Sequence, residues 1–394
     1  MLQKIKKVKI KDLLGFFILI VAFPFALVVK IKNRNNPIWL VCELKNTCRD
    51  NGYHFFKYVR INHPNVKCYY AINKKCIDYN KIAEYKNIIQ FGSFKHWIYY
   101  LASEYNISTH KEGNPNHTVF TIVHLYFHLL NNRVFLQHGI TKDNVPMFYY
   151  KNTYFKYFIC GAKREYEYIK DVFGYPKENV VYTGFARFDN LHDKKVNRKK
   201  ILLIPTWRRW FELETSEIEF IESEYYQRWN EFINDKELVE FLEKENLELI
   251  FYPHYQMKKF INCFNVKSKN INIIVNDNVD IQQLLKECNL MITDYSSVYM
   301  DFAYMRKPVI YYQFDYNKYR NSHLLEGYFD YKTDGFGKVC NSKNELVKQI
   351  IKYCKNEFEI EEEYITRMDD FFEYSDTKNC ERIYDVLKKG RQYA

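Results

Sequence analysis

The chain has 394 residues, of which 47% are hydrophobic, and a formal net charge of +11 at pH 7. This length allows two domains of ordinary size, and the apolar content is that of a globular protein. The positive charge suggests anionic partners such as phosphates, nucleic acid or a membrane face. The ten cysteines form no CxxC pair and no regular spacing. They therefore argue for a reducing compartment and against a disulfide scaffold or a zinc site.

The N-terminus combines a basic start with an almost purely apolar stretch, residues 13–29, and further basic residues follow it. No small-residue cleavage site of a signal peptide is present there. An apolar stretch of about 17 residues is the lower limit for crossing a bilayer, and Gly15 and Pro24 interrupt it. Basic flanks are typical of a segment held in the cytoplasmic leaflet by anionic lipid. We therefore expect residues 1–35 to attach the chain monotopically to the cytoplasmic face of the membrane. A single span and a buried core helix are the alternatives.

Beyond Pro37, short apolar runs alternate with helix-like runs, which is typical of parallel α/β sheets. A charged patch over residues 192–200 reads as a linker. We therefore predict two doubly wound, Rossmann-like α/β domains that face each other across a cleft, residues 36–192 and 193–365. Residues 366–394 are expected to form a helix that packs back on the first domain. The predicted strands are 38–42, 67–72, 88–91, 105–108, 134–137, 157–160, 180–183, 201–204, 247–252, 271–275, 290–293 and 309–312. The predicted helices are 53–61, 94–101, 163–173, 225–245, 281–287, about 298–305, and 361–387.

Four polar turns follow predicted strands directly. In an open parallel sheet, ligands bind outside the carboxyl ends of the strands, so these turns are expected at the ligand-binding edge. The turns are residues 137–142, 205–208, 253–254 and 294–297.

The first turn offers a histidine and a glycine. Gly139 permits close approach of a backbone, and His138 is placed at a strand end where it can act as a general base near neutral pH. The plainer interpretation is that a single histidine at a strand end is a structural residue.

The other turns offer groups that bind phosphate. Arg208 can grip a phosphate with two N–H groups, and His254 can donate a hydrogen bond to one. Ser296 and Ser297, at the expected start of a helix, can bind a second phosphate. The plainer interpretation is that one of the serines only caps the helix. Arg208 also has an equally basic neighbour in Arg209, and either of the two can be a simple surface charge.

Acidic and histidine residues elsewhere have weaker patterns. Asp294 can cap its turn, and Asp301 can pair with Arg306. His124 and His128 are four residues apart, but no glutamate lies between them and no third ligand is in view, so no metal site is predicted. No P-loop or GxGxxG motif is present, which leaves ATP or dinucleotide use without support.

Five motifs occur in a fixed order along the chain: LQHGITKD, TGFARFD, LLIPTWR, YPHYQ and TDYSSVYMDFAYMRKPVIYYQFD. Together they resemble the CDP-glycerol glycerophosphotransferase family of teichoic-acid and capsule polymerases. The resemblance runs from about residue 38 to the C-terminus, and residues 48–52 and 376–382 also resemble family positions. Many members have tryptophan before the HG pair, whereas this chain has Gln137.

The resemblance implies a GT-B fold and monotopic membrane association. It implies transfer of glycerol phosphate, or a related alditol phosphate, from CDP-glycerol to a hydroxyl of a cell-surface polymer or lipid-linked acceptor. CMP would be released, in teichoic-acid-like or capsular polysaccharide biosynthesis. The implied partners are therefore the CDP-alditol donor, the acceptor and an anionic membrane surface. No cofactor is firmly implied, and the use of Mg²⁺ is left open.

The resemblance also assigns roles to residues. His138 corresponds to the HG histidine, expected as the base on the acceptor hydroxyl. Arg208, His254 and the two serines are expected on the donor phosphates, with Asp294 and Asp301 shaping that loop and helix. The predicted catalytic residues are His138, His254 and Asp294. The predicted substrate-binding residues are Gly139, Lys142, Arg187, Thr206, Arg208, Ser296, Ser297 and Asp301.

Two other functions fit parts of the sequence. A GT-B glycosyltransferase that uses a nucleotide sugar would share the fold and the diphosphate site. A non-catalytic, basic, membrane-associated binding protein would explain the net charge and the N-terminal segment. The lysines beyond residue 34 are dispersed and no aromatic-basic RNA-binding motif is present, so no nucleic-acid partner is predicted.

Overall fold

The computed structural model describes residues 10–130, 132–193, 196–211, 214–275, 279–322 and 325–390. The chain divides into two compact units. Unit 1 comprises Met1–Ile140, Pro146–Asn190 and Asp376–Ala394, and unit 2 comprises Thr141–Val145 and Leu191–Ser375. The expected boundaries fell after residues 192 and 365, whereas the units divide after residues 190 and 375. The short segment Thr141–Val145 belongs to unit 2, which the sequence analysis did not predict.

Unit 1 is built on a seven-stranded sheet in the order β3-β2-β1-β4-β5-β6-β7, and every neighbouring pair of strands is parallel. This is the doubly wound topology that the alternation of strands and helices predicted. The strands are β1 (Trp39–Val41), β2 (Cys68–Ile72), β3 (Ile88–Gln90), β4 (Tyr105–Ser108), β5 (Arg133–Phe135), β6 (Tyr157–Cys160) and β7 (Val180–Tyr182).

Helices cover both faces of this sheet, because successive side chains of a strand point to opposite faces. Trp39 and Val41 pack in one apolar cluster with residues of α3 and α16, whereas Leu40 and Cys42 pack in another with residues of α2, α5 and α6. The helices are α2 (Ile10–Lys32), α3 (Asn51–Asn62), α4 (Tyr79–Ile82), α5 (Phe94–Ala102), α6 (His117–Tyr126), α7 (Lys163–Val172) and α16 (Asn379–Gly390). Short 3-10 turns are η1 (Ala83–Tyr85), η2 (Pro146–Phe148), η3 (Tyr150–Asn152), η4 (Lys177–Asn179) and η5 (Ala186–Asn190).

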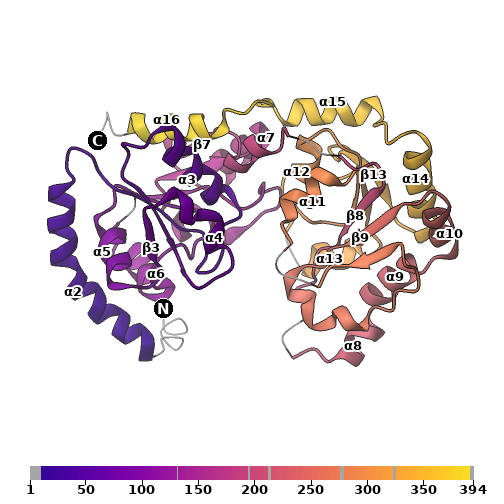
Figure 1. Cartoon of the computed structure of the whole chain (residues 1–394), viewed down its shortest axis with the longest axis horizontal. Helices are drawn as coiled ribbons and strands as arrows, with labels where there is room; N and C mark the ends of the chain where they lie inside the picture. Colours follow the sequence, from indigo (N-terminus) through magenta and orange to yellow (C-terminus); the bar gives the residue numbers. More distant parts are fainter. Residues whose placement is uncertain are drawn as a thin grey trace. The chain divides into compact units, whose positions relative to one another are not determined.

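The apolar N-terminal segment forms the continuous helix α2, and Pro24 lies inside it without ending it. The helix packs against α5 and α6, and Figure 1 shows it at the outer edge of unit 1. Ala22 and Ala26 are buried, whereas Phe17 and Ile20 on α2 are 64% and 71% exposed. By length and composition, α2 is apolar enough to cross a membrane, although only a small part of it is buried in the protein.

Unit 2 is built on a six-stranded parallel sheet in the order β10-β9-β8-β11-β12-β13. The edge strand β13 was not predicted, because its sequence GKVC holds a glycine and a lysine and has no clear apolar alternation. In both sheets the strand order reverses beside the first strand of the unit, between β1 and β4 and between β8 and β11, where ligands bind in such folds. The strands are β8 (Lys200–Ile204), β9 (Glu248–Phe251), β10 (Ile271–Ile273), β11 (Leu290–Thr293), β12 (Val309–Tyr312) and β13 (Gly337–Cys340).

The helices of unit 2 correct two predictions. The expected helix 225–245 is two helices, because the Asp235 side chain accepts the backbone N–H of Leu238 and starts a new one. The expected helix 361–387 is also two, α15 in unit 2 and α16 in unit 1. The helices are α8 (Glu217–Glu222), α9 (Glu224–Ile233), α10 (Lys236–Lys244), α11 (Ile281–Glu287), α12 (Tyr299–Tyr304), α13 (Tyr316–Ser322), α14 (Lys343–Lys355) and α15 (Glu362–Phe371), with the 3-10 turn η6 (Tyr255–Cys263).

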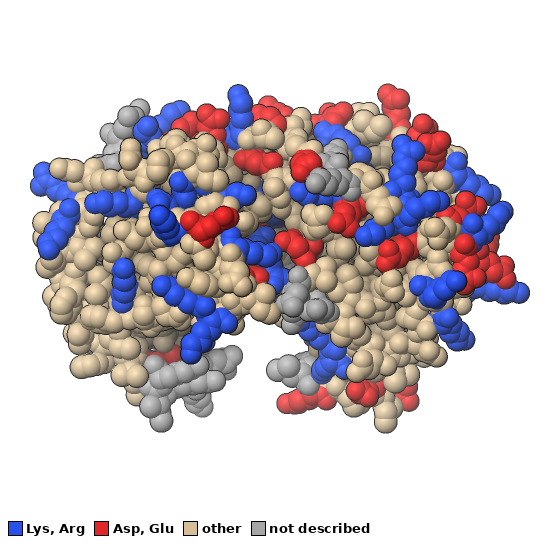
Figure 2. Space-filling model, viewed as in Figure 1, with Lys and Arg blue, Asp and Glu red and all other residues tan. Residues whose placement is uncertain are grey.

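Charged side chains are spread over the surface. Figure 2 shows the lysine and arginine side chains dispersed over the visible face of each unit, without one dense basic patch on that face.

Candidate active site

His138 lies in the turn after β5, and the residue before it, Gln137, fixes the backbone of that turn. Gln137 has a φ of 58°, in the left-handed region that a residue with a side chain rarely adopts. Its side-chain amide donates to the carbonyl of Ile159 (2.7 Å) and to Glu165 (3.0 Å). Its own carbonyl accepts a hydrogen bond from the Asn51 side chain (2.8 Å). Contacts on both sides thus hold a strained backbone in place, a feature that is common at functional sites.

His138 itself is exposed, and its ring stacks on that of His110 with centroids 4.9 Å apart and planes within 6°. The Nδ1 atom of His110 lies 2.7 Å from the Thr109 hydroxyl. Burial, and then the neighbouring His138, lower the pKa of His110 to about 4, so His110 is neutral at pH 7. His138 is therefore an oriented, solvent-accessible imidazole at a strand end, as a general base requires. His110 was missed, although it follows β4 in the same way as His138 follows β5.

Arg187, predicted to bind substrate, is buried in unit 1. Its guanidinium pairs with Asp50 (2.9 Å), and its backbone N–H donates to the Asn51 side chain (3.0 Å). Asn51 also holds the carbonyl of Gln137. Arg187 thus supports the start of α3 and, through Asn51, the turn that carries His138.

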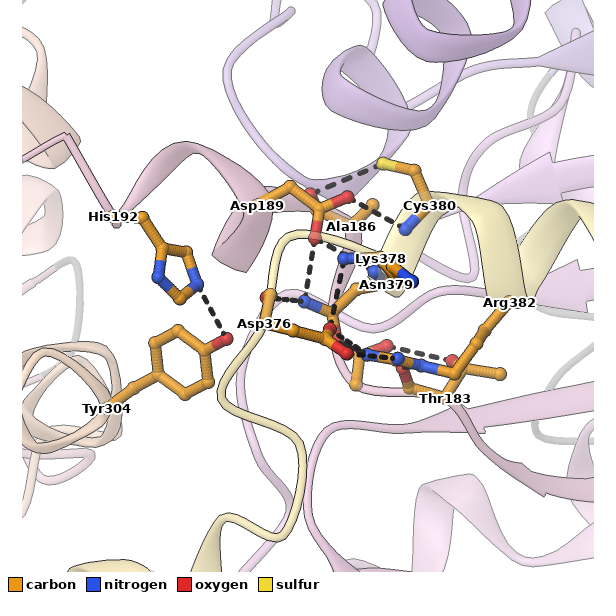
Figure 3. A network of polar contacts seen from close by, with 11 residues as sticks. Thr183, Ala186, Asp189, His192, Tyr304, Asp376, Lys378, Asn379, Cys380 and Arg382 are labelled. Carbon is orange, nitrogen blue, oxygen red and sulfur yellow. Dashed lines mark hydrogen bonds and ion pairs between the residues drawn. The ribbon is translucent and has the colours of Figure 1, made fainter.

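The TGFARFD motif and the C-terminal motif, residues 376–382, meet in one network within unit 1 (Figure 3). Asp189 accepts the backbone N–H groups of Asn379 (2.9 Å) and Cys380 (2.9 Å) and the side-chain amide of Asn379 (2.7 Å). Arg382 donates to the carbonyl of Thr183 (2.8 Å). These two motifs form a clasp that starts α16, which is a structural role.

Arg208 lies in unit 2 after β8, and its side chain is fully buried. Its Nε and one terminal nitrogen donate to Asp315 (2.7 and 3.1 Å), and an ion pair joins it to Asp294 (2.8 Å). Its remaining nitrogen donates to the carbonyl of Thr206 (2.6 Å). Burial opposes the charge, but the two carboxylates raise the pKa of Arg208 above its ordinary value. This differs from the expected phosphate contact, because protein groups already satisfy the guanidinium.

Asp294 ties the β11 turn to its neighbours. Its Oδ1 accepts the backbone N–H groups of Thr206 (2.7 Å) and Tyr295 (2.6 Å), and its carbonyl accepts the Gln313 side chain (3.1 Å). The carboxylate is completely buried. In this structure Asp294 therefore positions the turn, and its predicted catalytic role stays a prediction.

The serines of the same turn do not cap the helix that follows. The N-cap residue of α12 is Val298, without a side-chain hydrogen bond, which corrects the expected cap. Ser296 and Ser297 are half-buried, and neither hydroxyl forms a hydrogen bond within the part of the chain that the structure describes. The buried Thr206 hydroxyl likewise has no described partner. The turns after β8 and β11 thus carry three hydroxyl groups that a ligand could satisfy.

Lys142, also predicted to bind substrate, is buried in unit 2. It pairs with Asp143 (2.5 Å), which also pairs with Arg320 (2.5 Å). Burial alone would raise the pKa of Asp143, but the two cations lower it. In this structure the lysine therefore serves an ion-pair network within unit 2.

Two further predicted residues are Gly139, in the turn after β5, and Asp301, in helix α12. Gly139 follows His138 and is half-buried. Asp301 is buried in α12, and the expected pairing with Arg306 is corrected, because Arg306 pairs with Asp369.

His254 follows β9 and caps the 3-10 turn η6. Its Nδ1 accepts the backbone N–H of Gln256 (3.3 Å), and its ring stacks on Trp207 with centroids 6.1 Å apart. Burial lowers the pKa of His254 to about 4. The imidazole is therefore neutral at pH 7, and since Nδ1 accepts, Nε2 carries the proton and can donate to a phosphate.

A pocket of about 760 Å³ lies beside this histidine in unit 2. Trp207 and Tyr255 contribute aromatic walls, and Arg209, Lys258 and Lys259 contribute positive charge. Arg209 is exposed, unlike its neighbour in the chain. The sequence pattern suggested that Arg209 could be a simple surface charge, whereas in the structure it is the arginine of this turn that lines a pocket.

Comparison with known proteins finds relatives in teichoic acid biosynthesis. The family described as CDP-Glycerol:Poly(glycerophosphate) glycerophosphotransferase matches residues 22–389. The chain is 38% identical over 375 residues to the minor teichoic acid biosynthesis protein GgaB of Bacillus subtilis, covering 91% of this chain and 40% of GgaB. It is 25% identical over 238 residues to the teichoic acid ribitol-phosphate polymerase TarL of Staphylococcus aureus, covering 57% of this chain and 39% of TarL. The chain thus spans about two fifths of the length of these relatives.

Solved structures show the same fold. The wall teichoic acid polymerase TagF superposes with a TM-score of 0.64 at 16% identity, covering 95% of this chain and 98% of that chain. A putative UDP-N-acetylglucosamine 2-epimerase from Listeria monocytogenes superposes with a TM-score of 0.57 at 13% identity, covering 91% and 96%. These likenesses confirm the predicted GT-B-like architecture of two Rossmann-like domains. The family match, together with the identity to GgaB, confirms the resemblance of the motifs: the chain belongs to the CDP-glycerol:poly(glycerophosphate) glycerophosphotransferase family.

Proposed function

We propose that the chain transfers glycerol phosphate, or a related alditol phosphate, from CDP-glycerol to a hydroxyl of a polymer or lipid-linked acceptor. The acceptor oxygen forms a bond to the β-phosphorus of the donor, and the bond from that phosphorus to the CMP phosphate breaks. The acceptor proton passes to a base, and CMP leaves with the bonding electrons. Family membership and an exposed, oriented histidine in the family's HG motif together support this reaction.

In unit 1, His138 is the proposed base. Its exposure admits an acceptor hydroxyl, and the stack on the neutral ring of His110 fixes its plane. The locked conformation of Gln137 fixes the backbone from which it projects. A catalytic base must be held within hydrogen-bond reach of the proton that it removes, and these contacts supply that order.

In unit 2, the donor diphosphate is proposed to bind at the turns after β8, β9 and β11. The hydroxyls of Thr206, Ser296 and Ser297 lack described protein partners, and the Nε2–H group of His254 is a further donor. Fixed donors of this kind stabilise the charge that develops on a departing nucleotide. Arg209 in the adjacent pocket adds the positive charge that was assigned to Arg208.

The identity of the donor alditol and the need for Mg²⁺ are both open to the same assay. A TagF variant has been solved with CDPG, whereas TarL is named as a ribitol-phosphate polymerase, so glycerol and ribitol donors both belong in the test. Among the described residues, no group of three histidine, cysteine or acidic side chains could hold a metal ion. The assay therefore includes the removal of Mg²⁺ with EDTA.

The proposed location is the cytoplasmic face of the cell membrane. The exposed apolar side of α2 supports peripheral or monotopic attachment through that helix. Basic residues at its C-terminal end, Lys30 and Lys32, would face anionic lipid headgroups.

The decisive experiment measures nucleotide release by the purified chain. CDP-glycerol, CDP-ribitol and a UDP-sugar are offered in parallel with a polymeric or lipid-linked acceptor, with and without EDTA. We expect CMP from CDP-glycerol. Turnover of the UDP-sugar alone would contradict the proposal and favour a nucleotide-sugar glycosyltransferase.

The role of His138 is tested by His138→Ala. We expect CMP formation to fall by at least about a hundredfold, the usual contribution of a general base, while CDP-glycerol still binds. His128, another exposed histidine of unit 1, provides the matched control as His128→Asn. Unchanged turnover in His138→Ala would remove the proposed base.

A further inference from the structure

Arg133, the first residue of β5, is a buried charge without an acidic partner. The residue is only 9% exposed, and it forms no ion pair with a described residue. One terminal nitrogen donates to the carbonyl of Thr153, the guanidinium lies over the ring of Phe155 (4.7 Å), and Nε has no hydrogen-bond partner. An arginine that is buried in this way loses its hydration without gaining a counter-charge. This loss costs free energy unless a ligand supplies the counter-charge.

A pocket of about 390 Å³ lies against this arginine in unit 1. Lys111 and His117 also line it, and none of the described residues in its wall is acidic. The Lys111 ammonium donates to the carbonyl of Met147 (3.0 Å) and remains half-exposed. The pocket thus gathers basic groups without a carboxylate in its wall, which suits an anion.

Asn114 adds an acceptor to the same wall. It is 3% exposed, and its amide nitrogen donates to the carbonyl of Lys111 (3.3 Å), whereas its Oδ1 has no partner. Buried polar groups in native proteins are nearly always paired, so an orphan donor on Arg133 and an orphan acceptor on Asn114 in one wall point to a missing ligand. Such a ligand needs an anionic oxygen for the arginine and a hydroxyl for the asparagine. A polyol phosphate carries both.

The pocket also lies close to the proposed base. A second, smaller cavity is lined by Arg133 and Lys111 together with His110, and the ring of His110 stacks on His138. We propose that the 390 Å³ pocket binds a phosphate and an adjacent hydroxyl of the acceptor's polyol-phosphate chain. This inference rests on the proposed function, since it gives the place in unit 1 where the acceptor chain would bind beside His138.

The test measures binding of a short poly(glycerol phosphate) oligomer to the full chain by calorimetry, without any CDP-glycerol. We expect Arg133→Gln to weaken binding by about tenfold to a hundredfold, the range for the loss of a charge-assisted hydrogen bond. Because Arg133→Gln alters a buried site, Lys111→Gln, at a half-exposed position, gives a second variant with the same expected direction. Arg198→Gln, whose side chain is 69% exposed in unit 2, is the control and should bind like the wild type.

Two further arms separate the sources of the phosphate. Inorganic phosphate and vesicles of phosphatidylglycerol are offered in place of the oligomer. Tighter binding of the oligomer than of either probe supports the inference. Unchanged oligomer binding in both Arg133→Gln and Lys111→Gln overturns it. So does a result in which these variants lose binding to the vesicles but keep binding to the oligomer.

Kinetics then distinguishes this inference from the proposed function. In the transfer assay, Lys111→Gln should raise the KM for the acceptor and leave the KM for CDP-glycerol unchanged. A chain that binds the oligomer through Arg133 but releases no CMP would contradict the proposed reaction and leave the pocket assignment standing. If the chain releases CMP and both variants keep the wild-type KM for the acceptor, the pocket assignment is contradicted and the proposed reaction stands.

Discussion

At the scale of single residues, two adjacent arginines have opposite environments. Arg208 is fully buried between Asp294 and Asp315, whereas Arg209 is exposed and lines the 760 Å³ pocket. Successive residues after a strand still tend to point to opposite sides, so one of the pair turns inward and the other outward. The buried arginine holds the turn that presents Ser296 and Ser297.

This difference predicts opposite phenotypes. Arg208→Met leaves two buried carboxylates without a counter-charge and should destabilise unit 2 by about 3–5 kcal/mol. Arg209→Gln should leave stability unchanged and weaken CDP-glycerol binding by about tenfold. Thermal unfolding and ligand titration of both variants check this. Normal stability in Arg208→Met would show that its ion pairs are dispensable.

Buried histidines predict how stability depends on pH. Burial lowers the pKa of His96 from 6.5 to about 3, so the folded state binds a proton there less readily than the unfolded state does. The stabilisation is complete above about pH 6.5 and is lost as the pH falls toward 3. Between pH 7 and pH 5 this one residue should cost about 2 kcal/mol.

Urea unfolding at pH 7 and pH 5 measures that loss. His96→Gln should unfold with a smaller difference between the two pH values than the wild type. His128→Asn changes an exposed histidine and should keep the wild-type difference. An equal difference in all three proteins would mean that His96 does not carry this pH dependence.

At the scale of elements, α2 has one buried side and one exposed side, which its sequence does not reveal. The sequence shows a nearly uniform apolar stretch, and only packing against α5 and α6 separates buried positions from exposed ones. Ala22 and Ala26 are small and allow close contact with the protein, while larger side chains such as Phe17 and Ile20 project outward. Small residues on one side and large apolar residues on the other suit a helix that lies between protein and lipid.

The exposed side of α2 predicts binding to lipid. Replacing Phe17 and Ile20 with serine should weaken sedimentation with anionic vesicles by at least about tenfold, because each side chain loses apolar area that lipid would cover. Ile218→Ser removes an equally exposed isoleucine, 70% exposed on α8 of unit 2, and should have no effect. Equal loss in both variants would point to general aggregation.

At the scale of the whole molecule, the C-terminal segment completes unit 1. After α15 in unit 2, the chain returns to unit 1, where Asp189 and Thr183 bind the start of α16 (Figure 3). Gly184 makes this approach feasible: its φ is +77°, and a Cβ atom there would lie 1.8 Å from the Asn379 side chain. The first domain is therefore assembled from segments at both ends of the chain.

Gly184→Ala should therefore open the clasp. Backbone strain and the clash with Asn379 together should destabilise unit 1 by more than about 1 kcal/mol. Gly174→Ala is the matched control in the same unit, since Gly174 has a φ of +72° but no neighbouring atom of the described residues within 4 Å of its Cβ position. The measurement is amide hydrogen exchange, in which α16 should lose protection in Gly184→Ala while unit 2 serves as an internal reference. Equal protection in both variants would show that strain alone, and not the clasp, matters.

Much of the fold follows from local pattern. The predicted strand 157–160 agrees with β6, and the predicted helix 281–287 agrees with α11. Apolar runs between turns specify such elements by themselves. The edge strand β13 and the break before Lys236 were missed, because one lacks an apolar alternation and the other depends on a single capping aspartate. The sequence predicted the turns after β5, β8, β9 and β11, but not which of their side chains are buried and which are exposed.

By itself, the sequence determined the two parallel sheets, the apolar N-terminal helix and the order of the family motifs, because periodicity and motif order are local properties of the chain. Only the tertiary structure decided that Arg208 is buried and Arg209 exposed, and that Asp189 binds the start of α16. It also decided that Gln137 adopts a left-handed backbone beneath His138. The physical reason is that these features depend on partners far away in the chain, whose burial and hydrogen bonds exist only after the sheets and helices have packed.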